Sequence, residues 1–246
     1  MTQGGNEGSS LDLLLAGQMP QRYLRNEATI GVKGQLKLLQ AKVAVVGAGG
    51  LGGHAIELLA RLGVGYLKVI DGDCFDETNL NRQLLASTQT MGTNKAVAAA
   101  ARVAAINPEL ELIACRCRLT AENAVELLNE LDVIVDGLDN FSSRQILLAV
   151  AQQLKIPVVY AAIAGCTGQV STVLPTDDAI RRLLQQPQPE DRGVEAVLGN
   201  PATTPAVAAA LQVQEVVKLI TGRGQLLSEK LVYFDLESNL FELINL

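Results

Sequence analysis

The chain has 246 residues, 48% of them hydrophobic, and carries 26 acidic against 20 basic residues, which gives a net charge of −6. This length suits an α/β domain with a large buried core. The acidic balance argues against broad binding to nucleic acid or to an anionic membrane, since both favour basic patches. The sequence shows neither a secretory leader pattern nor an apolar run long enough to span a bilayer, so we expect a cytoplasmic protein.

The first forty residues divide into a polar tail and a helical segment. Residues 1–10 are small and polar without periodicity, which predicts a disordered tail. We expect residues 11–246 to form a single domain. Residues 11–40 are typical of short helices, with the segment QRYLRNE inside them.

A glycine-rich segment comes next. Residues 42–46 predict a short buried strand, GAGGLG is the turn after it, and residues 54–62 carry apolar positions at helical spacing. Gly47, Gly49 and Gly52 fit a GxGxxG pattern, in which the missing side chains let the chain turn tightly and let free N–H groups and the helix dipole face an anion. We therefore expect a nucleotide phosphate at this helix N-terminus.

The following strand, YLKVID, ends in Asp71, about where an acidic residue accepts hydrogen bonds from a ribose hydroxyl. On these features alone, a nicotinamide or flavin dinucleotide enzyme is the commoner interpretation. The polar residues that come after favour a triphosphate, because Arg grips phosphate oxygens with a planar fork and Lys neutralises charge on a leaving pyrophosphate. These residues are Asp73, Asn79, Arg82, Gln83 and Lys95. The alternative for Arg82 and Lys95 is that they are solvated surface charges.

The middle of the chain predicts alternating helices and strands. An alanine-rich helix over residues 93–106 precedes a third strand in INPELELIACRC, and TAENAVELLNEL predicts a helix with Thr120 as its N-cap. The apolar run DVIVDGLDN belongs in a parallel sheet covered on both faces, so Asp139 falls at the carboxyl-end edge where ligands bind. Asp136 lies at the strand end, and Asn140 can cap the next helix in place of Asp139.

The last third adds two strands in IPVVYAAIAGCTGQVSTVLP, joined by a glycine-containing loop. Residues 176–205, which include QQPQPEDRG, form a long connection typical of a functional lid or a disordered segment. Residues 205–221 predict an amphipathic helix that ends at Gly222, and LVYFDLESNLFELINL predicts a hairpin with Ser238 and Asn239 in its turn. Antiparallel strands there would offer a surface for a small protein partner. The expected fold is α/β: a Rossmann-like, mostly parallel sheet with helices on both faces and an appended antiparallel C-terminal part.

The pieces GAGGLG, D-x-D, NLNRQ, GTNK and GLDN occur in this order. Together they resemble the MoeB/ThiF/HesA family of ubiquitin-activating-enzyme-like adenylyltransferases, from about residue 22 to the C-terminus. The resemblance implies that Asp71 binds the ribose of ATP and that Asp139 holds its magnesium ion. Asn79, Arg82 and Lys95 would bind the phosphates. The implied nucleotide site as a whole consists of Gly47, Gly49, Gly50, Gly52, Asp71, Asp73, Asn79, Arg82, Gln83, Lys95, Asp139 and Asn140.

The segment QRYLRNE is similar to the R-Y-x-R segment of that family, whose second arginine reaches into the ATP site of the partner subunit. The resemblance therefore implies a homodimer and makes Arg25 a catalytic candidate. The alternative is that Arg25 is a surface helix residue.

The four cysteines, Cys74, Cys115, Cys117 and Cys166, form no C-x-x-C pair. Cys115 and Cys117 would face the same side of a strand rather than clasp a metal. Many family members carry two C-x-x-C pairs that hold a structural zinc, but the corresponding regions here contain no cysteine, so we expect no zinc site. Some members also place a catalytic cysteine in the segment matching residues 176–205. This chain has none there, and nothing near Cys166 in the sequence would lower its pKa.

These features favour ATP-dependent adenylation of the C-terminal glycine carboxylate of a small ubiquitin-like sulfur-carrier protein, of the molybdopterin or thiamine type, with ATP and Mg²⁺ as cofactors and Gly-Gly at the carrier's C-terminus. Catalysis would consist of positioning and charge stabilisation by Arg25, Arg82, Lys95 and Asp139, without an enzyme nucleophile. His54, the only histidine, is expected at a helix surface. The alternatives are a nicotinamide-dependent oxidoreductase, a non-catalytic scaffold of the same fold, and a related enzyme that activates a tRNA base, which the acidic charge disfavours.

Overall fold

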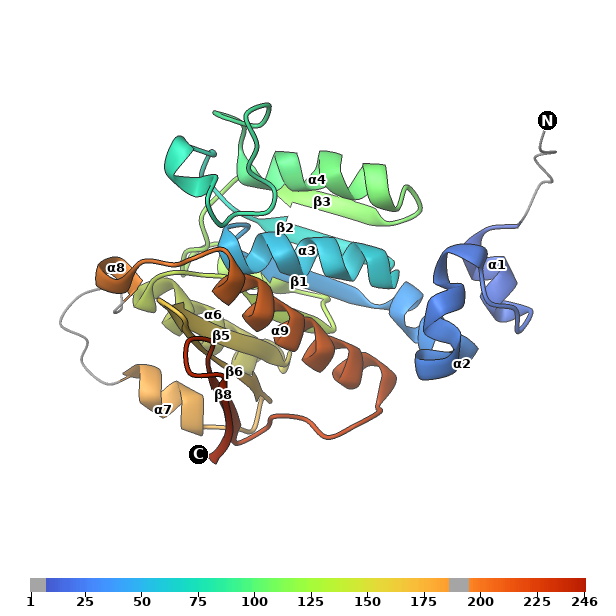
Figure 1. Cartoon of the computed structure of the whole chain (residues 1–246). Coiled ribbons are helices and arrows are strands. Elements are labelled where there is room, and N and C mark those ends of the chain that lie inside the picture. The colour runs from blue at the N-terminus through green and yellow to red at the C-terminus, as the bar shows by residue number, and fades with distance from the viewer. Residues whose placement is uncertain (1–7, 186–194) are drawn as a thin grey trace.

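The computed structural model describes residues 8–185 and 195–246, so the expected tail over residues 1–7 and most of QQPQPEDRG lie outside the described residues. Its centre is an eight-stranded sheet with the order β3-β2-β1-β4-β5-β6-β7-β8 (Figure 1). The five parallel strands are β1 (Lys42–Val46), β2 (Tyr66–Ile70), β3 (Glu111–Cys115), β4 (Val133–Asp136) and β5 (Val158–Ala164). The antiparallel strands that extend the sheet are β6 (Thr167–Val173), β7 (Lys230–Asp235) and β8 (Leu240–Asn245). This arrangement confirms the expected fold class.

Helices cover both faces of the sheet (Figure 1). One face carries α3 (Gly50–Leu62), α4 (Lys95–Ile106) and α9 (Thr203–Thr221). The other carries α5 (Ala124–Leu128), α6 (Phe141–Leu154) and α7 (Ala179–Gln185). The described residues also form α1 (Ser10–Leu15), η1 (Gln21–Asn26), α2 (Glu27–Gln40), η2 (Glu77–Asn79) and α8 (Glu195–Leu198). None of the helices in residues 8–185 and 195–246 is long and apolar enough to cross a membrane.

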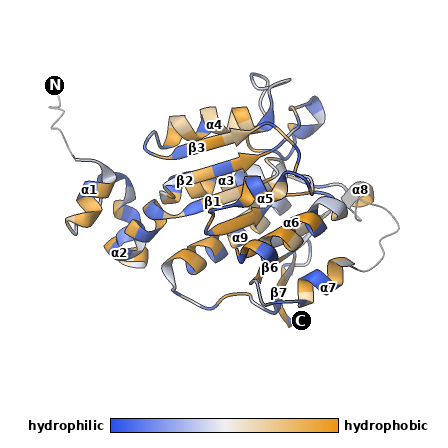
Figure 2. Cartoon of the chain, turned by 180° about the vertical axis from the view of Figure 1, so that it is seen from behind, coloured by the Kyte–Doolittle hydropathy of each residue, from blue (hydrophilic) through white to orange (hydrophobic). Residues whose placement is uncertain are grey.

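The sheet is buried on both faces because its central strands β1 and β4 are apolar apart from Lys42 at the start of β1 and Asp136 at the end of β4. In β1, Val43 and Val45 belong to the hydrophobic core beneath α3 and α9, while Ala44 and Val46 belong to the core beneath α6. Figure 2 shows the hydrophobic colour along the strands, whereas several covering helices carry both colours. Alternate residues of a strand point to opposite faces, so a continuous apolar run is what a doubly covered parallel strand requires.

Two expected boundaries near the N-terminus differ from the structure. Ser10 begins α1, and Ser9 caps it by accepting a hydrogen bond from the backbone N–H of Asp12, so the polar tail does not extend to residue 10. The helix after the glycine-rich turn begins at Gly50, four positions before the expected start. The last glycines of GAGGLG therefore lie inside the first helical turn.

The N-cap predicted at Thr120 was wrong. The helix begins at Ala124, and Asn123 occupies the cap position. The Asn123 side chain closes a turn instead, because its Oδ1 accepts the Thr120 N–H at 2.8 Å and its Nδ2 donates to Arg118 O at 2.9 Å. The strand before this turn ends at Cys115, so Cys117 lies beyond it. The C-terminal hairpin and the end of α9 before Gly222 are confirmed.

Candidate functional site

A cavity of about 520 Å³ lies at the carboxyl ends of the parallel strands. The loops that follow β1, β2, β3 and β4 all contribute to its wall, together with the segment before α4 and the start of α6. This is the edge at which open α/β sheets bind ligands. Its size lies within the range of small-molecule sites.

Some glycines of the glycine-rich turn are required for close backbone packing, and some line the cavity. Gly47 has φ +90°, and a Cβ there would lie 2.5 Å from Gly137 O. A Cβ at Gly52 would lie 1.7 Å from Gly47 O, so Gly52 is required for close packing and does not reach the cavity wall. Gly47, Gly49 and Gly50 all lie on the wall. The first N–H groups of α3 have no acceptor within the helix, so the turn presents donors and the positive end of the helix dipole to the cavity.

Asp71 follows β2 and faces the same cavity. Its Oδ2 accepts the N–H of Ala48 at 2.7 Å, and its Oδ1 accepts the N–H of Asp73 at 2.8 Å. Burial raises the pKa of Asp71, although the two N–H groups and the nearby Lys95 charge act in the opposite direction. The carboxylate keeps lone pairs for the hydroxyls of a sugar.

Lys95 and Asp73 form a charged pair on the wall, at a distance of 3.8 Å between Nζ and Oδ2. Lys95 begins α4, and only 10% of its side chain is exposed. Asn94 fixes this arrangement, since its Nδ2 donates to the carbonyl groups of Asp71 and Asp73 and its Oδ1 caps the helix. The sequence motif GTNK contained Asn94, but the expected site residues did not include it.

Arg82 and Gln83 also lie on the wall, as expected. Arg82 Nη1 donates to Thr78 O and to Asn81 Oδ1, both at 2.9 Å. The Gln83 side chain packs beside Gly49, and its Oε1 is buried without a hydrogen-bond partner in the described part of the chain. A buried polar atom at a cavity wall is available to a ligand or to water.

Asn79 does not lie on the wall, although it belongs to the same motif. It sits in η2, where its Oδ1 accepts the N–H of Asp76 at 3.3 Å and Asp76 in turn accepts the N–H of Thr78. This capping box holds the Asn79 amide within its own turn. A phosphate-binding role for Asn79 stays a prediction.

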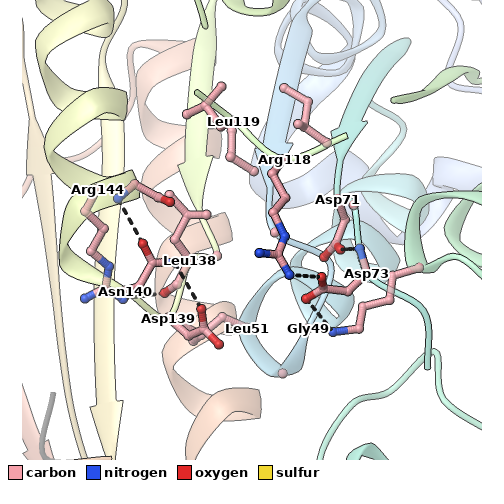
Figure 3. A pocket seen from close by; sticks show the side chains of 18 of the residues that line it. Gly49, Leu51, Asp71, Asp73, Arg118, Leu119, Leu138, Asp139, Asn140 and Arg144 are labelled. Carbon is pink, nitrogen blue, oxygen red and sulfur yellow. Dashed lines mark hydrogen bonds and ion pairs between the residues drawn. The ribbon is translucent and has the colours of Figure 1, made fainter. Parts of the chain in front are cut away.

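Asp139 is exposed on the far side of the cavity, where Figure 3 shows it across from Asp71 and Asp73. Asn140 Nδ2 donates to Asp139 Oδ1 at 3.3 Å, and Asn140 Oδ1 caps α6 through the N–H of Ser143. The capping role therefore belongs to Asn140, which leaves the Asp139 carboxylate directed to the site.

Arg144 supports the loop that carries Asp139. Its Nη2 donates to Leu138 O at 2.6 Å and to Ala161 O at 2.9 Å, and its Nε lies 3.4 Å from Asp136 Oδ2. Asp136 is fully buried, which raises its pKa, while the Arg144 charge opposes that change. Arg144 was missed in the sequence, because no motif marks a buried arginine inside a helix.

A second hollow of about 320 Å³ adjoins the first, and the two share Asp139, Asn140, Arg144, Ala162 and Ile163. It is lined mainly by side chains from β5, β6 and β7, among them Tyr160, Ile163, Thr167, Gln169 and Tyr233. The two hollows thus adjoin along a shared wall that includes Asp139.

Arg25 lies away from both hollows. It is exposed on η1, whose Tyr23 packs against Gly63 at the C-terminal end of α3. The N-terminal end of α3 faces the cavity, and a helix of 13 residues spans about 20 Å. Arg25 therefore does not complete the cavity of its own chain. His54 lies on α3 outside the wall, and burial lowers its pKa.

The model of the ThiF family matches residues 23–246. The SAMP-activating enzyme E1 of Haloferax volcanii is 35% identical over 236 residues, covering 96% of this chain and 87% of that protein. The sulfur carrier protein adenylyltransferase of Thermus thermophilus is 36% identical over 219 residues, covering 84% and 79%. Among solved structures, E. coli MccB with ATP has a TM-score of 0.78 at 23% identity, over 92% of this chain and 71% of that one. At that identity, the structural likeness shows the fold.

Proposed function

Because the chain belongs to the ThiF family, we propose that it is an adenylyltransferase that uses ATP to activate the C-terminal carboxylate of a small ubiquitin-like sulfur-carrier protein. The observation that carries the proposal is the pair of adjoining hollows, which share a wall that includes Asp139. One combines a helix N-terminus with cationic side chains, as a triphosphate requires, and the other is smaller and lined largely by strands. Two substrates, a nucleotide and a protein terminus, would fit these two hollows.

The nucleotide would lie along the carboxyl edge of the sheet. Its phosphates would face the N–H groups at the start of α3, with Lys95 and Arg82 beside them. Its ribose would bind Asp71, which ends the neighbouring strand. The carrier's terminal glycines would lie in the second hollow, because glycine has no side chain to clash with a wall that includes Tyr160 and Tyr233.

A terminal carboxylate oxygen would form a bond to the α-phosphorus while the bond from that phosphorus to the bridging oxygen breaks. The products are an acyl adenylate and pyrophosphate. Lys95 and Arg82 would stabilise the negative charge that builds on the leaving pyrophosphate, so the protein acts by positioning and electrostatics and needs no nucleophile of its own. The acyl adenylate would then be ready for sulfur transfer.

The residues present also fit a magnesium ion that arrives with ATP. Mg²⁺ is commonly held by one or two carboxylates together with phosphate oxygens and water, and Asp139 exposes one carboxylate at the cavity. Such an ion would neutralise charge on the phosphate oxygens. Within residues 8–185 and 195–246, no group of three or more His, Cys, Asp or Glu side chains could hold a metal ion.

We further propose a homodimer in the cytoplasm, in which Arg25 of each subunit enters the other subunit's site. Its exposure, and its distance from the cavity of its own chain, support a contribution across an interface. The carrier protein would dock on β7 and β8, where Leu240, Phe241 and Leu243 are exposed. Exposed apolar side chains on adjacent strands are typical of protein-binding surfaces.

ATP–pyrophosphate exchange tests the function directly. Exchange should appear when a small carrier with a free C-terminal Gly-Gly is added, and not with the same carrier lacking its last glycine. Asp139→Ala should reduce the exchange about a hundredfold or more, as expected when one preorganised charge-stabilising group is lost. The matched control is Glu126→Ala, which removes an exposed carboxylate of α5 away from the cavity.

Two outcomes would overturn the proposal. Tight NADH binding without ATP binding would favour an oxidoreductase, and exchange that depends on tRNA would favour activation of a tRNA base. The genes adjacent to this one would indicate the carrier, because a neighbouring small protein ending in Gly-Gly would identify the pathway.

A further inference from the structure

Arg118 stands at the mouth of the cavity, although no sequence motif marks it (Figure 3). Its side chain is 81% exposed, yet its Nη2 donates to Asp73 Oδ1 at 2.9 Å. Figure 3 shows the guanidinium between the Asp71–Asp73 segment and Asp139. The Asp73 carboxylate thus connects two cations of the wall, Arg118 and Lys95.

The backbone at Arg118 and after it is held in place. The next residue, Leu119, is buried, and Arg118 O accepts a hydrogen bond from Asn123 Nδ2 at 2.9 Å. The loop after β2 also makes room for the arginine, because a Cβ at Gly72 would lie 2.9 Å from Arg118 Cγ. The Arg118 backbone is hydrogen-bonded, its guanidinium is paired with Asp73, and Gly72 leaves space for its side chain. A solvated surface arginine has none of these restraints.

The position along the sheet edge indicates which part of a nucleotide Arg118 would meet. The phosphate-binding turn follows β1 and the ribose acid Asp71 follows β2, so the base would lie beyond them, at the end of β3. Arg118 and Leu119 come from the loop after β3, and Leu119 and Ile70 give that end of the cavity an apolar wall. Arginine stacks well on an aromatic face because its guanidinium is planar.

We propose that Arg118 is a nucleotide-binding residue whose guanidinium, held at one edge by Asp73, covers the adenosine part of the bound ATP. The inference rests on the proposed function, since it takes ATP as the ligand. In this proposal, Asp73 pairs with both cations, Arg118 at the adenosine and Lys95 at the phosphates.

Isothermal titration calorimetry with ATP, adenosine and inorganic tripolyphosphate tests the inference. Arg118→Ala should weaken the binding of ATP and of adenosine by a similar factor, roughly tenfold, and leave tripolyphosphate binding unchanged. Arg118→Lys keeps the charge but not the planar face, so its affinities should stay close to those of Arg118→Ala. The matched control is Arg116→Ala, which removes an exposed arginine from the same segment without touching the cavity wall.

Each other outcome has a defined meaning. Weaker tripolyphosphate binding in Arg118→Ala would assign the residue to the phosphates and overturn the inference, as would full recovery of affinity in Arg118→Lys. Unchanged ATP binding in Arg118→Ala would also overturn the inference, because the Arg118–Asp73 pair would then be only a surface ion pair. The proposed function would not be affected. A wild-type protein that does not bind ATP would overturn both proposals.

Discussion

The carboxylate of Asp71 accepts the backbone N–H of Ala48 at 2.7 Å, which fixes the acid after β2 to the glycine-rich turn after β1. Its other oxygen accepts the N–H of Asp73 at 2.8 Å. One side chain therefore sets the relative positions of the glycine-rich turn and the polar segment that carries Asp73. Removal of the Asp71 side chain would therefore change the shape of the cavity and not only one contact to a ligand.

The pH dependence of stability should reveal this buried acid. Burial raises the pKa of Asp71 above that of the unfolded chain, so between the two values the folded state binds more protons. The free energy of unfolding then falls as the pH rises through that window. Asp71→Asn lacks this titration. Urea unfolding at steps from about pH 4 to about pH 7 should show the wild type losing stability relative to Asp71→Asn as the pH rises. A constant difference between the two proteins would contradict the assignment.

The buried pair of Arg144 and Asp136 leads to a second prediction. Arg144→Met would leave the fully buried Asp136 without its cation, and breaking such a pair typically costs about 3–5 kcal/mol of unfolding free energy. The double variant Arg144→Met/Asp136→Asn removes the charge as well and should recover part of that loss. Urea unfolding measures both values. Equal stability of the single and double variants would show that Arg144 acts mainly through its bonds to Leu138 O and Ala161 O.

Much of the site could be located from the sequence because its residues lie in short segments with strong local geometry. Gly49, Asp71, Lys95 and Asp139 each follow a strand of the parallel sheet or begin a helix at its carboxyl edge, and topology alone brings those places together. The same reasoning also assigned Asn79 to the site, but Asn79 does not line the cavity and its Oδ1 accepts the N–H of Asp76, so its phosphate-binding role stays a prediction. The D-x-x-N spacing of the segment DETN is the sequence signal that predicts the capping box of these two residues.

The residues that were missed come from parts of the chain without a motif. Arg118 follows a strand in a segment without glycine or repeated polar pattern, and Arg144 lies within a helix. Their positions depend on tertiary partners, Asp73 for one and the carbonyl groups of Leu138 and Ala161 for the other. Sequence spacing does not encode such long-range contacts, whereas it does encode the alternation of strands and helices.

Zinc content gives a third prediction. Residues 176–200 and the extreme C-terminus, where the family resemblance leads us to look for zinc-binding cysteine pairs, contain no cysteine, so we expect no stoichiometric zinc in the purified protein. Its thermal unfolding should be the same with and without a chelator, because a structural zinc contributes folding free energy that a chelator removes. Elemental analysis that finds about one zinc per chain would contradict this prediction.

The last prediction concerns the shared site of the proposed homodimer. Arg25→Ala and Asp139→Ala should each abolish nearly all ATP–pyrophosphate exchange, because each removes one half of every composite site. When the two variants are mixed and exchange subunits, about half of the dimers become heterodimers, and each heterodimer contains one site with both residues intact. About a quarter of all sites are then complete, if a phosphate-clamping arginine acts across the interface. Exchange activity should rise towards that fraction of the wild-type value.

The complementation needs two controls to be decisive. Native mass spectrometry must show that heterodimers form, and a mixture of Arg25→Ala with the double variant Arg25→Ala/Asp139→Ala must stay inactive, since no pairing of its chains restores Arg25. Activity that stays absent while heterodimers are present would remove Arg25 from the site, because η1 packs at the end of α3 opposite the cavity of its own chain. Activity in Arg25→Ala alone would lead to the same conclusion and leave Lys95 and Arg82 as the cations that stabilise the leaving pyrophosphate.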